Sequence, residues 1–530
     1  MERPIRTPFS SRNAYVLRMG VFVAVLAFSA FVLFRLVSCE EDDAYTHERI
    51  AANLMRLGAP WFNPTDRVMS TSAPVWTLLL AGLMKLTPSH NPVPLIEALA
   101  IATVCACGLV LASRALRSSN CGPATAAVTY FAIIVFSVSS LLPAGVAQME
   151  TPFALAVAML AIVWLDELPG LSLALLVVAG FTRYELIGLF LFAALHLMLL
   201  RRLKPKTLLP PALVFAAIAL WLLKNFHTMI PNSVKAKKVV YVMLHRPMSA
   251  TLSGVHMRGQ IELVLFAVLT FYLVWAARRG VLSPYEKHSA GILLFAFGGA
   301  LWFVYVVERA FIFEWYRPLV LVPLCLGAVL TVVAAGRLWG SIPAILLILL
   351  IMPISIPAGG YLMAALRDRP SSAPEYANAA RVHTYLAVGN AIDQACPGAT
   401  LMTSEIGALG HSFHGYIYDG VGLTNPDALK YHPMKVPQER RTGTLGAIPV
   451  GYVREKLPDV IVSYDTYAEA LLRSSAMQNY VDRAYPIFLP ADSLQELKAR
   501  SAHRALHVMV RAGGHCDTSR VQQEVARTYE

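Results

Sequence analysis

The sequence predicts a polytopic α-helical membrane protein with a soluble α/β domain at its C-terminal end. Of its 530 residues, 56% are hydrophobic and only 15% are charged, which is too apolar for a soluble protein of this length. Apolar runs long enough for membrane spans recur between about residues 18 and 358. From about residue 368 the composition becomes that of an ordinary soluble domain.

Twelve apolar runs are candidates for spans, and the charges of the loops decide which of them cross. The run 74–86 is short for a span. If it lies in the outer interface, every strongly basic loop falls on one side of the membrane, so we expect eleven spans, an inside N-terminus and an outside C-terminus. The expected spans are 18–38, 94–113, 123–142, 151–165, 170–182, 186–200, 207–223, 261–277, 289–307, 317–335 and 340–358.

The net charge of +12 would suit a nucleic-acid partner in a soluble protein. Here Lys and Arg fall mostly in short loops between apolar runs, where they set the topology. We therefore expect the lipid bilayer, and no nucleic acid, as a partner.

Residues 1–366 form the predicted membrane domain and residues 367–530 the predicted soluble domain. In the second, residues 377–395 have the pattern of a helix, and strands are expected within 399–405, 416–423 and 458–464. This polar part holds two cysteines, Cys396 and Cys516. Outside the cytosol they could form a disulfide, but pairing cannot be read from sequence.

A run of four carboxylates, Glu40, Glu41, Asp42 and Asp43, directly follows the first span. Charges beside lipid are costly unless they have a function. Asp42 and Asp43 are adjacent and would point apart, so they are unlikely to share one proton. One could act as a general base while the other binds a donor, an acceptor hydroxyl or a cation. The structural alternative is that the run caps the helix 44–57.

Hard oxygen ligands of this kind would also suit a divalent cation. A hard-ion site normally draws ligands from several loops, and the sequence shows no convincing second set. We therefore expect no cofactor and no required metal.

Two short motifs place further charges at the outer membrane boundary. AQMETP contains Glu150, which could hydrogen-bond a sugar or cap the helix ahead of Pro152. FTRYEL contains Arg183 and Glu185 between two apolar runs, where charges pair or face a cavity.

Two other outer segments carry basic and aromatic residues. The sequence IPNSVKAKK sets Asn232, Lys235 and Lys237 on the outer side, against the positive-inside bias. Lysines at that height suit a lipid-linked phosphate, with a solvated basic loop as the alternative. FEWYRP adds Arg317 with Trp315 and Tyr316, and the two rings could simply belong to the interfacial aromatic belt.

Several of these stretches together resemble the bacterial glycosyltransferase C superfamily, and most of all its arabinofuranosyltransferase-like branch. The resemblance runs from about residue 40 to 465. It implies a multispanning enzyme that moves a sugar, in this branch a pentose such as arabinofuranose, from a polyprenyl-phosphate carrier to a glycan or protein acceptor, with inversion. The stretches are EDDAYTHERIAANL, WFNPTDRV, TSAPVWTLLLA, QMET, FTRYE, IPNSVKAK, EWYRP and SEIGALGHSFHGYIYDGVGLTNP.

The resemblance also implies roles for individual residues. An aspartate of the first outer loop, Asp42 or Asp43, is the base. The sequence departs from the family pattern at Tyr184, where a proline is expected, and in QMET, which lacks a glycine. From their charge and position we assign Lys235, Lys237, Arg183 and Arg317 to the donor phosphate, and Glu150, Asn232, Tyr316 and Trp315 to substrate binding.

The resemblance places the chain in the bacterial cytoplasmic membrane, with the C-terminal domain in the periplasm or cell envelope. Two other functions compete with the transferase. A flippase or transporter of a lipid-linked sugar would use the same lysines but would want polar residues along its spans. A non-catalytic envelope scaffold would leave the acidic run unexplained.

Overall fold

The computed structural model describes residues 11–87, 91–119, 123–240, 289–308, 313–334, 358–374, 376–434, 448–487 and 505–529. They belong to two compact units. The helical unit takes residues 1–37, 93–217 and 246–367, and the mixed unit takes residues 38–92, 218–245 and 368–530. The mixed unit thus joins the C-terminal segment to two earlier segments, while the division at residue 367 stays a prediction.

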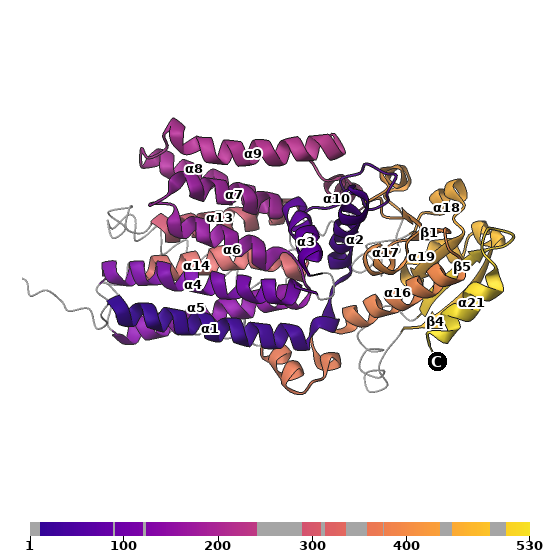
Figure 1. Cartoon of the computed structure of the whole chain (residues 1–530), viewed down its shortest axis with the longest axis horizontal. Helices are drawn as coiled ribbons and strands as arrows, with labels where there is room; N and C mark the ends of the chain where they lie inside the picture. The colour runs from indigo at the N-terminus through magenta and orange to yellow at the C-terminus, as the bar shows by residue number, and fades with distance from the viewer. Residues whose placement is uncertain are drawn as a thin grey trace, which may run out of the picture. The chain divides into compact units, whose positions relative to one another are not determined.

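The helical unit consists of apolar helices that lie lengthwise beside one another (Figure 1). α13 packs on α14, α1 on α4, and α6 on both α4 and α7. Short 3-10 turns, η2 (Tyr184–Leu186) and η5 (Glu314–Tyr316), precede α8 and α14. These helices include α1 (Ser11–Arg35), α4 (Val93–Ser119), α5 (Pro123–Val146), α6 (Thr151–Trp164), α7 (Pro169–Thr182), α8 (Ile187–Leu199), α9 (Pro205–Phe226, in this unit to residue 217), α13 (Ser289–Val307) and α14 (Arg317–Ala334).

Among the described residues, four helices are long and apolar enough to cross a membrane: Arg18–Arg35, Val93–Arg117, Pro123–Val146 and Pro205–Phe226. Shorter apolar helices accompany them. The chain is therefore a polytopic helical membrane protein, as its composition predicts. The predicted spans 261–277 and 340–358 lie outside the described residues apart from position 358, so the count of eleven stays a prediction.

Glycines let α13 and α14 approach closely. A Cβ at Gly298 would lie 2.6 Å from the backbone nitrogen of Leu324, and one at Gly327 would overlap the backbone of Phe295. Small residues at such positions allow membrane helices to pack backbone to backbone. This contact holds the middle of α14, the helix that begins in the EWYRP motif.

The mixed unit contains a five-stranded sheet in the order β2-β1-β3-β5-β4. β1 pairs parallel with β2 and β3, and β5 pairs antiparallel with β3 and β4. The predicted helix and the three predicted strands are all present, as α16, β1, β2 and β3. The strands are β1 (Thr400–Thr403), β2 (Tyr416–Asp419), β3 (Val460–Tyr464), β4 (Tyr480–Pro486) and β5 (Ala505–Arg511).

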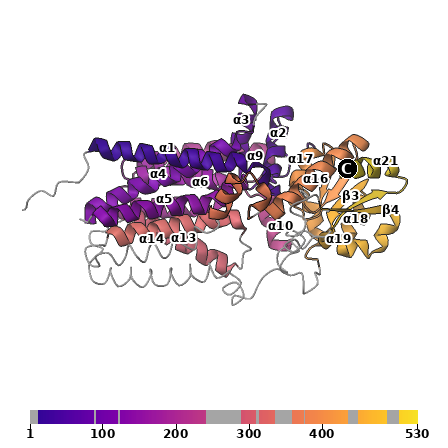
Figure 2. The same ribbon diagram turned by 90° about the horizontal axis from the view of Figure 1, so that it is seen from below.

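Helices cover both faces of this sheet (Figure 2). Val460, Val462 and Tyr464 of β3 join the core under α16, α17 and α21, while Ile461 joins the core under α18 and α19. A strand buried on both faces needs a continuous apolar run, which is what VIVSY supplies. The elements are α16 (Tyr376–Ala395), α17 (Gly407–Ser412), α18 (Val450–Lys456), α19 (Asp465–Leu472), α21 (Thr518–Arg527), η8 (Pro426–Tyr431) and η10 (Ser475–Asn479).

Cys396 and Cys516 form a disulfide, with their Cα atoms 5.5 Å apart. The bridge joins the chain just after α16 to the chain just before α21. The sequence leaves this pairing open because residues 120 positions apart are brought together only by the fold.

Three earlier helices complete the mixed unit: α2 (Asp42–Leu57), α3 (Pro74–Leu86) and α10 (Asn232–Val240). α2 packs on both α17 and α3, and it ends at Gly58 in the left-handed conformation, with φ of 68°. The 13 residues of α3 span about 20 Å, which is less than the hydrocarbon core of a bilayer. Its assignment to the outer interface stays a prediction.

Candidate functional site

Asp42 is the first residue of α2, but its side chain serves another helix. It accepts hydrogen bonds from the backbone nitrogens of Gly407, at 3.0 Å, and Ala408, at 2.8 Å. It is only 9% exposed, and this burial raises its pKa against the lowering effects of Arg381 and the two amides. Asp42 therefore caps the N-terminus of α17. The sequence alternative is a cap on the helix that follows the acidic run, which is a different helix.

Glu41 is held by Arg381 of α16. The Arg381 Nη2 atom lies 3.6 Å from Glu41 Oε2, and the same guanidinium forms an ion pair with Glu405. The guanidinium is buried, and the nearby carboxylates keep its pKa raised in spite of that burial. Arg381 thus attaches the acidic run to the segment that leads into α17.

Glu40 and Glu48 form a buried pair of carboxyl groups. They are hydrogen-bonded to each other, and Tyr45 is hydrogen-bonded to Glu40. Burial raises the pKa of Glu48 to about 7, and burial with the charge of Glu48 raises the pKa of Glu40 well above its usual value. The hydrogen-bonded pair of carboxyl groups in this region is thus Glu40 with Glu48. Sequence reasoning missed Glu48, which lies on α2, whereas Glu40 precedes that helix.

Asp43 differs from its three neighbours. Its side chain is half-buried, and none of the hydrogen bonds or ion pairs among the described residues involves it. The structure therefore distinguishes two adjacent aspartates that the sequence leaves equivalent. Asp43 is thus the carboxylate of the run whose side chain is not engaged by another group in the described part of the chain.

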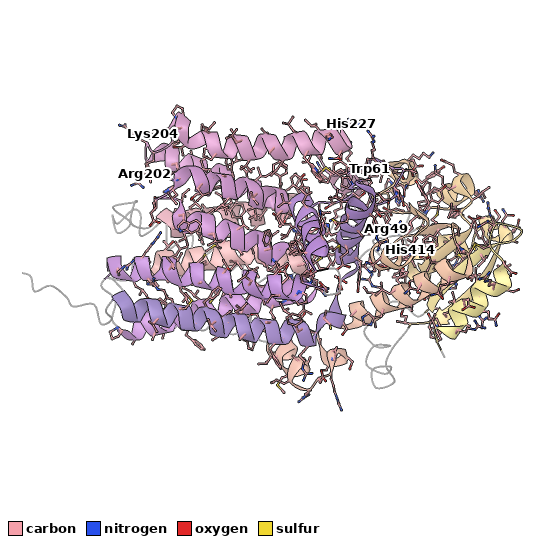
Figure 3. All side chains as sticks on the ribbon, viewed as in Figure 1. Arg49, Trp61, Arg202, Lys204, His227 and His414 are labelled. Carbon is pink, nitrogen blue, oxygen red and sulfur yellow. A yellow bond between two sulfur atoms is a disulfide. The ribbon has the colours of Figure 1, made fainter. Side chains whose placement is uncertain are left out.

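Arg49 and His47 fix α2 in its place. The buried Arg49 guanidinium, labelled in Figure 3, donates to the backbone carbonyls of Gly410, Phe413 and Gly415. His47 Nδ1 lies 3.1 Å from the hydroxyl of Thr71, so the STSAPVW segment that leads into α3 is tied to the same helix. Asp43 is consequently carried on a helix with fixed neighbours.

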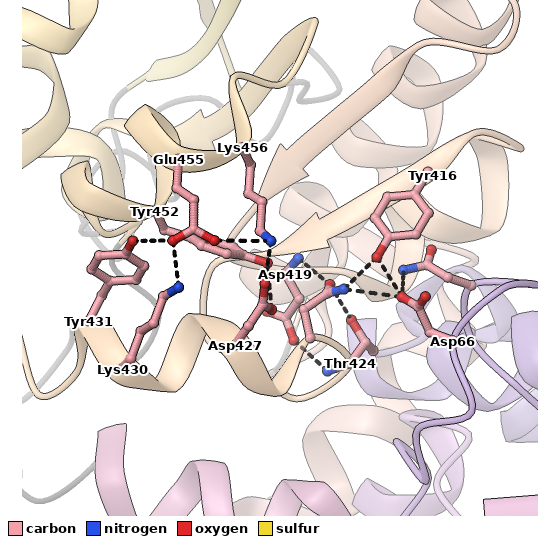
Figure 4. A network of polar contacts seen from close by, with 12 residues as sticks. Asp66, Tyr416, Asp419, Thr424, Asp427, Lys430, Tyr431, Tyr452, Glu455 and Lys456 are labelled. Atoms are coloured by element: carbon pink, nitrogen blue, oxygen red, sulfur yellow. Dashed lines mark hydrogen bonds and ion pairs between the residues drawn. The ribbon is translucent and has the colours of Figure 1, made fainter.

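Asn63 and Asp66 tie the first outer loop to β2. The Asn63 side chain donates to the Ile417 carbonyl at 2.9 Å and accepts from its nitrogen at 3.1 Å. The Tyr416 hydroxyl donates to Asp66, which also receives the amide of Asn425 (Figure 4). The sequence NPTD has the composition of an ordinary turn. In the structure its Asn63 and Asp66 form hydrogen bonds with residues of the edge strand β2.

Asn232 anchors the predicted phosphate-binding helix α10. Its side chain donates to the carbonyls of Gly422, at 2.7 Å, and Leu423, at 2.9 Å, and its backbone nitrogen donates to Met69 at 2.8 Å. Beyond this anchor Lys235 is exposed and Lys237 is half-buried. The amide of Asn232 is therefore engaged in holding the start of α10.

Glu150, Arg183 and Tyr316 come together in the helical unit. Arg183 Nε lies 2.7 Å from Glu150 Oε1, with side chains 2% and 0% exposed, and its guanidinium lies 4.3 Å from the centre of the Tyr316 ring. Phe313 stacks on Trp315, with ring centres 4.8 Å apart. Residues of the loosely matching motifs QMET and FTRYE thus form one cluster with Tyr316 and Trp315 of EWYRP.

Arg317 lies at the start of α14 and pairs with Glu314 at 2.5 Å, with both side chains partly exposed. A further member of the cluster, Glu97 of α4, was missed by sequence reasoning. It is completely buried and interacts electrostatically with Glu150. Its signal was present, because a single carboxylate inside the apolar run 94–113 is itself unusual.

The sequence-predicted residues therefore fall into two groups. The mixed unit holds Asp42, Asp43, Asn232, Lys235 and Lys237, and the helical unit holds Glu150, Arg183, Trp315, Tyr316 and Arg317.

Within the described ranges, no cluster of three or more His, Cys, Asp or Glu side chains is arranged to hold a metal ion. Independence of a metal ion stays a prediction.

Comparison with known proteins gives two matches. Residues 374–508 match a domain of unknown function, DUF8728. The crystal structure of ArnT from Cupriavidus metallidurans in the apo state is similar in fold, with a TM-score of 0.47 and 13% identity, over 94% of this chain and 98% of that chain. No curated protein matches the sequence. Similarity at this level carries no argument about activity, which has to come from the site.

Proposed function

We propose that this chain is a membrane glycosyltransferase of the glycosyltransferase C type, and that Asp43 is its general base. One observation carries the proposal. Glu40, Glu41 and Asp42 are engaged with protein groups, whereas Asp43 is half-buried and available on a helix with fixed neighbours. A base needs a carboxylate that is held in position but open to the proton it removes.

The donor in this proposal is a sugar linked to polyprenyl phosphate. Asp43 takes the proton of an acceptor hydroxyl as that oxygen forms a bond to the anomeric carbon. The bond from this carbon to the phosphate oxygen breaks, and polyprenyl phosphate leaves with the bonding electrons. A single displacement of this kind inverts the anomeric centre. Because phosphate is a good leaving group, the protein need only remove one proton and balance the departing charge.

Lys235 and Lys237 are the groups that we assign to the departing phosphate. They follow Asn232, whose two hydrogen bonds to the chain at residues 422–423 fix the start of α10. An ammonium group interacts with a phosphate as a compact charge and needs no bidentate geometry. The anchored helix therefore supplies positive charge without a metal ion.

The resemblance of the sequence motifs supports a pentose such as arabinofuranose as the transferred sugar, and a glycan or protein outside the cytoplasmic membrane as the acceptor. A flippase or a scaffold would give Asp43 no chemical task. The same resemblance supports a bacterial cytoplasmic membrane with the mixed unit on its outer side.

The release of polyprenyl phosphate tests this function without knowledge of the sugar. The purified full chain is reconstituted with an extract of the membranes and envelope of its source cells, which supplies both the lipid-linked sugar and the acceptor, and free polyprenyl phosphate is measured by mass spectrometry. A transferase or hydrolase of lipid-linked sugars releases it, whereas a transporter or scaffold does not. An unchanged level of polyprenyl phosphate, with intact lipid-linked sugar, would overturn the proposal.

The lysine assignment has its own test in the same assay. In the double variant K235A/K237A, the donor concentration at half-maximal rate should rise about tenfold or more, because two charges near the phosphate are lost. K238A, which removes the neighbouring exposed lysine, is the matched control. An unchanged KM in the double variant would exclude these lysines from donor binding.

A further inference from the structure

The buried cluster of the helical unit contains polar atoms that have no hydrogen-bond partner among the described residues. Both carboxylate oxygens of Glu97 are in this position, together with Arg183 Nη2, Trp315 Nε1 and the Thr151 hydroxyl. The exposed fractions are 0% for Glu97, 2% for Arg183 and 8% for Trp315. Native proteins bury few such groups, and each costs about 1–3 kcal/mol when it stays unsatisfied.

These residues are linked to one another through a chain of contacts within one unit. Glu97 interacts electrostatically with Glu150. Thr151 is the next residue after Glu150, and Glu150 Oε1 lies 2.7 Å from Arg183 Nε. Arg183 lies over the ring of Tyr316, whose centre is 6.0 Å from that of Trp315. Four helix ends, of α4, α6, α7 and α14, therefore bring the unsatisfied groups into one cluster.

The kinds of unsatisfied atom identify the chemistry of a ligand. Glu97 offers acceptors, whereas Arg183 and Trp315 offer donors. A divalent cation would satisfy Glu97 but would be repelled by Arg183 and leave both donors unsatisfied. A phosphate would satisfy the donors but would be repelled by the two glutamates. A hydroxyl group both donates and accepts, so a neutral polyhydroxy compound satisfies every member of the cluster.

The charges of the Glu150, Arg183 and Glu97 side chains also favour a neutral polyhydroxy ligand. Arg183 already balances Glu150 at 2.7 Å, so a second negative charge at Glu97 would be buried without compensation. In its neutral form Glu97 offers one donor and one acceptor, which matches a hydroxyl of a sugar. The rings of Phe313, Trp315 and Tyr316 provide apolar surface for the carbon side of the ring.

We propose that Glu97, Arg183 and Trp315 bind the hydroxyl groups of a neutral sugar, with Glu97 in its neutral form. The inference deepens the proposed function by naming a sugar subsite, and it rests on that function for the identity of the ligand as a sugar. It also moves Arg183 from the phosphate, where the sequence predicts it, to the sugar. Glu97 becomes a specificity-determining residue.

Sugar binding can be measured without turnover. The purified full chain in detergent micelles is titrated with a panel of methyl pentosides and methyl hexosides, and its thermal unfolding is followed. At least one glycoside should raise the Tm of the wild type and of E97Q, whose amide also donates and accepts. In E97L the Kd for that glycoside should rise about 10- to 100-fold, while E167L, which removes an exposed carboxylate, should match the wild type.

Each other outcome overturns the inference. Equal binding by E97L and wild type would remove Glu97 from the site, and no shift with any glycoside would remove the site itself. Equal loss in E97Q and E97L would mean that Glu97 acts through its charge. Because E97L replaces an unsatisfied buried carboxyl by an apolar group of similar size, its Tm without sugar should not fall.

A second probe separates this inference from the proposed function. Dodecyl phosphate should stabilise the wild type and E97L equally, and should not stabilise K235A/K237A. If the glycosides bind as expected but dodecyl phosphate does not, the phosphate-linked donor is wrong and the sugar subsite stands. If dodecyl phosphate binds as expected but E97L still binds the glycosides, the sugar subsite is wrong and the donor assignment stands.

Discussion

At the scale of single residues, Asp42 and Asp43 have opposite surroundings in spite of being adjacent. Asp42 accepts two backbone hydrogen bonds from residues more than 360 positions away, whereas Asp43 is half-buried and makes no such contact in the described part of the chain. Consecutive residues at the start of a helix point about 100° apart, so one side chain faces α17 and the other does not. Local geometry thus separates the structural task of Asp42 from the chemical task that we propose for Asp43.

The cap formed by Asp42 should be measurable as stability. D42A removes the acceptor for the nitrogens of Gly407 and Ala408, so the free energy of unfolding should fall by about 1–2 kcal/mol. D43A removes no such contact and should change stability by less than about 0.5 kcal/mol. Denaturant unfolding of the purified full chain measures both values. Equal losses in the two variants would contradict the division of tasks.

The Glu40–Glu48 pair should make stability depend on pH. The pKa of Glu48 rises from its ordinary 4.5 to about 7 in the fold, so the folded state binds this proton more tightly than the unfolded state. Its contribution is fully present below about pH 4.5 and is lost as the pH rises through about 7. E48Q should abolish this loss, which amounts to about 3 kcal/mol.

Thermal unfolding of wild type and E48Q between pH 5 and 8 checks this expectation. Because Glu40, Tyr45 and His411 also face Glu48, H411Q serves as a control for histidine titration. Parallel pH profiles of E48Q and wild type would show that the pair does not titrate in this range.

The limits of sequence reasoning are clearest at this scale. The acidic run is conspicuous because charge beside an apolar run is visible locally, and Glu97 could have been noticed in the same way. The partners Arg381, Gly407 and Ala408 could not, because they lie in a different part of the chain and meet the run only after folding. Adjacent carboxylates therefore stayed equivalent until their neighbours were known.

At the scale of elements, α2 and α17 depend on close backbone contact. A Cβ at Gly407 would overlap the carbonyl oxygen of Asp42, so only glycine permits this approach. Arg49 adds hydrogen bonds from α2 to the carbonyls of Gly410 and Phe413. The position of Asp43 therefore depends on a contact between helices that are distant in sequence.

The substitution G407A tests this dependence. It should displace α2 from α17 and lower the free energy of unfolding by more than about 2 kcal/mol, with release of polyprenyl phosphate falling in parallel. A Cβ added at Gly82 of α3 would have no atom within 4 Å, so G82A is the matched control and should be neutral or slightly stabilising. A fully stable and active G407A would contradict the described contact.

Elements were more predictable than contacts. Apolar runs predict helices because membrane helices must satisfy their backbone hydrogen bonds internally, and the α/β pattern after residue 376 predicts α16 and the first three strands. The attachment of residues 38–92 and 218–245 to the mixed unit was not predicted. It arises from single side chains such as Asn232 and Asn63, whose amides pair with distant backbone.

At the scale of the whole molecule, the proposed transferase requires an outer mixed unit. Lys430, with a side chain 52% exposed, lies in that unit, and Lys204, labelled in Figure 3 and also exposed, lies in a basic loop that the positive-inside rule places in the cytoplasm. The variant K430C should label with an impermeant thiol reagent in intact cells, whereas K204C should label only after permeabilisation. The reverse pattern would mean that α3 crosses the membrane.

The most direct test of the central claim compares D43N with D42N in the polyprenyl phosphate release assay, normalised to folded protein. Loss of a general base costs about 100-fold or more in rate, so D43N should lose release by at least that factor while its thermal stability matches that of the wild type. D42N should lose stability, with release per folded molecule reduced by less than about tenfold, since its part is to hold α17. Full release by D43N would show that Asp43 is not the base.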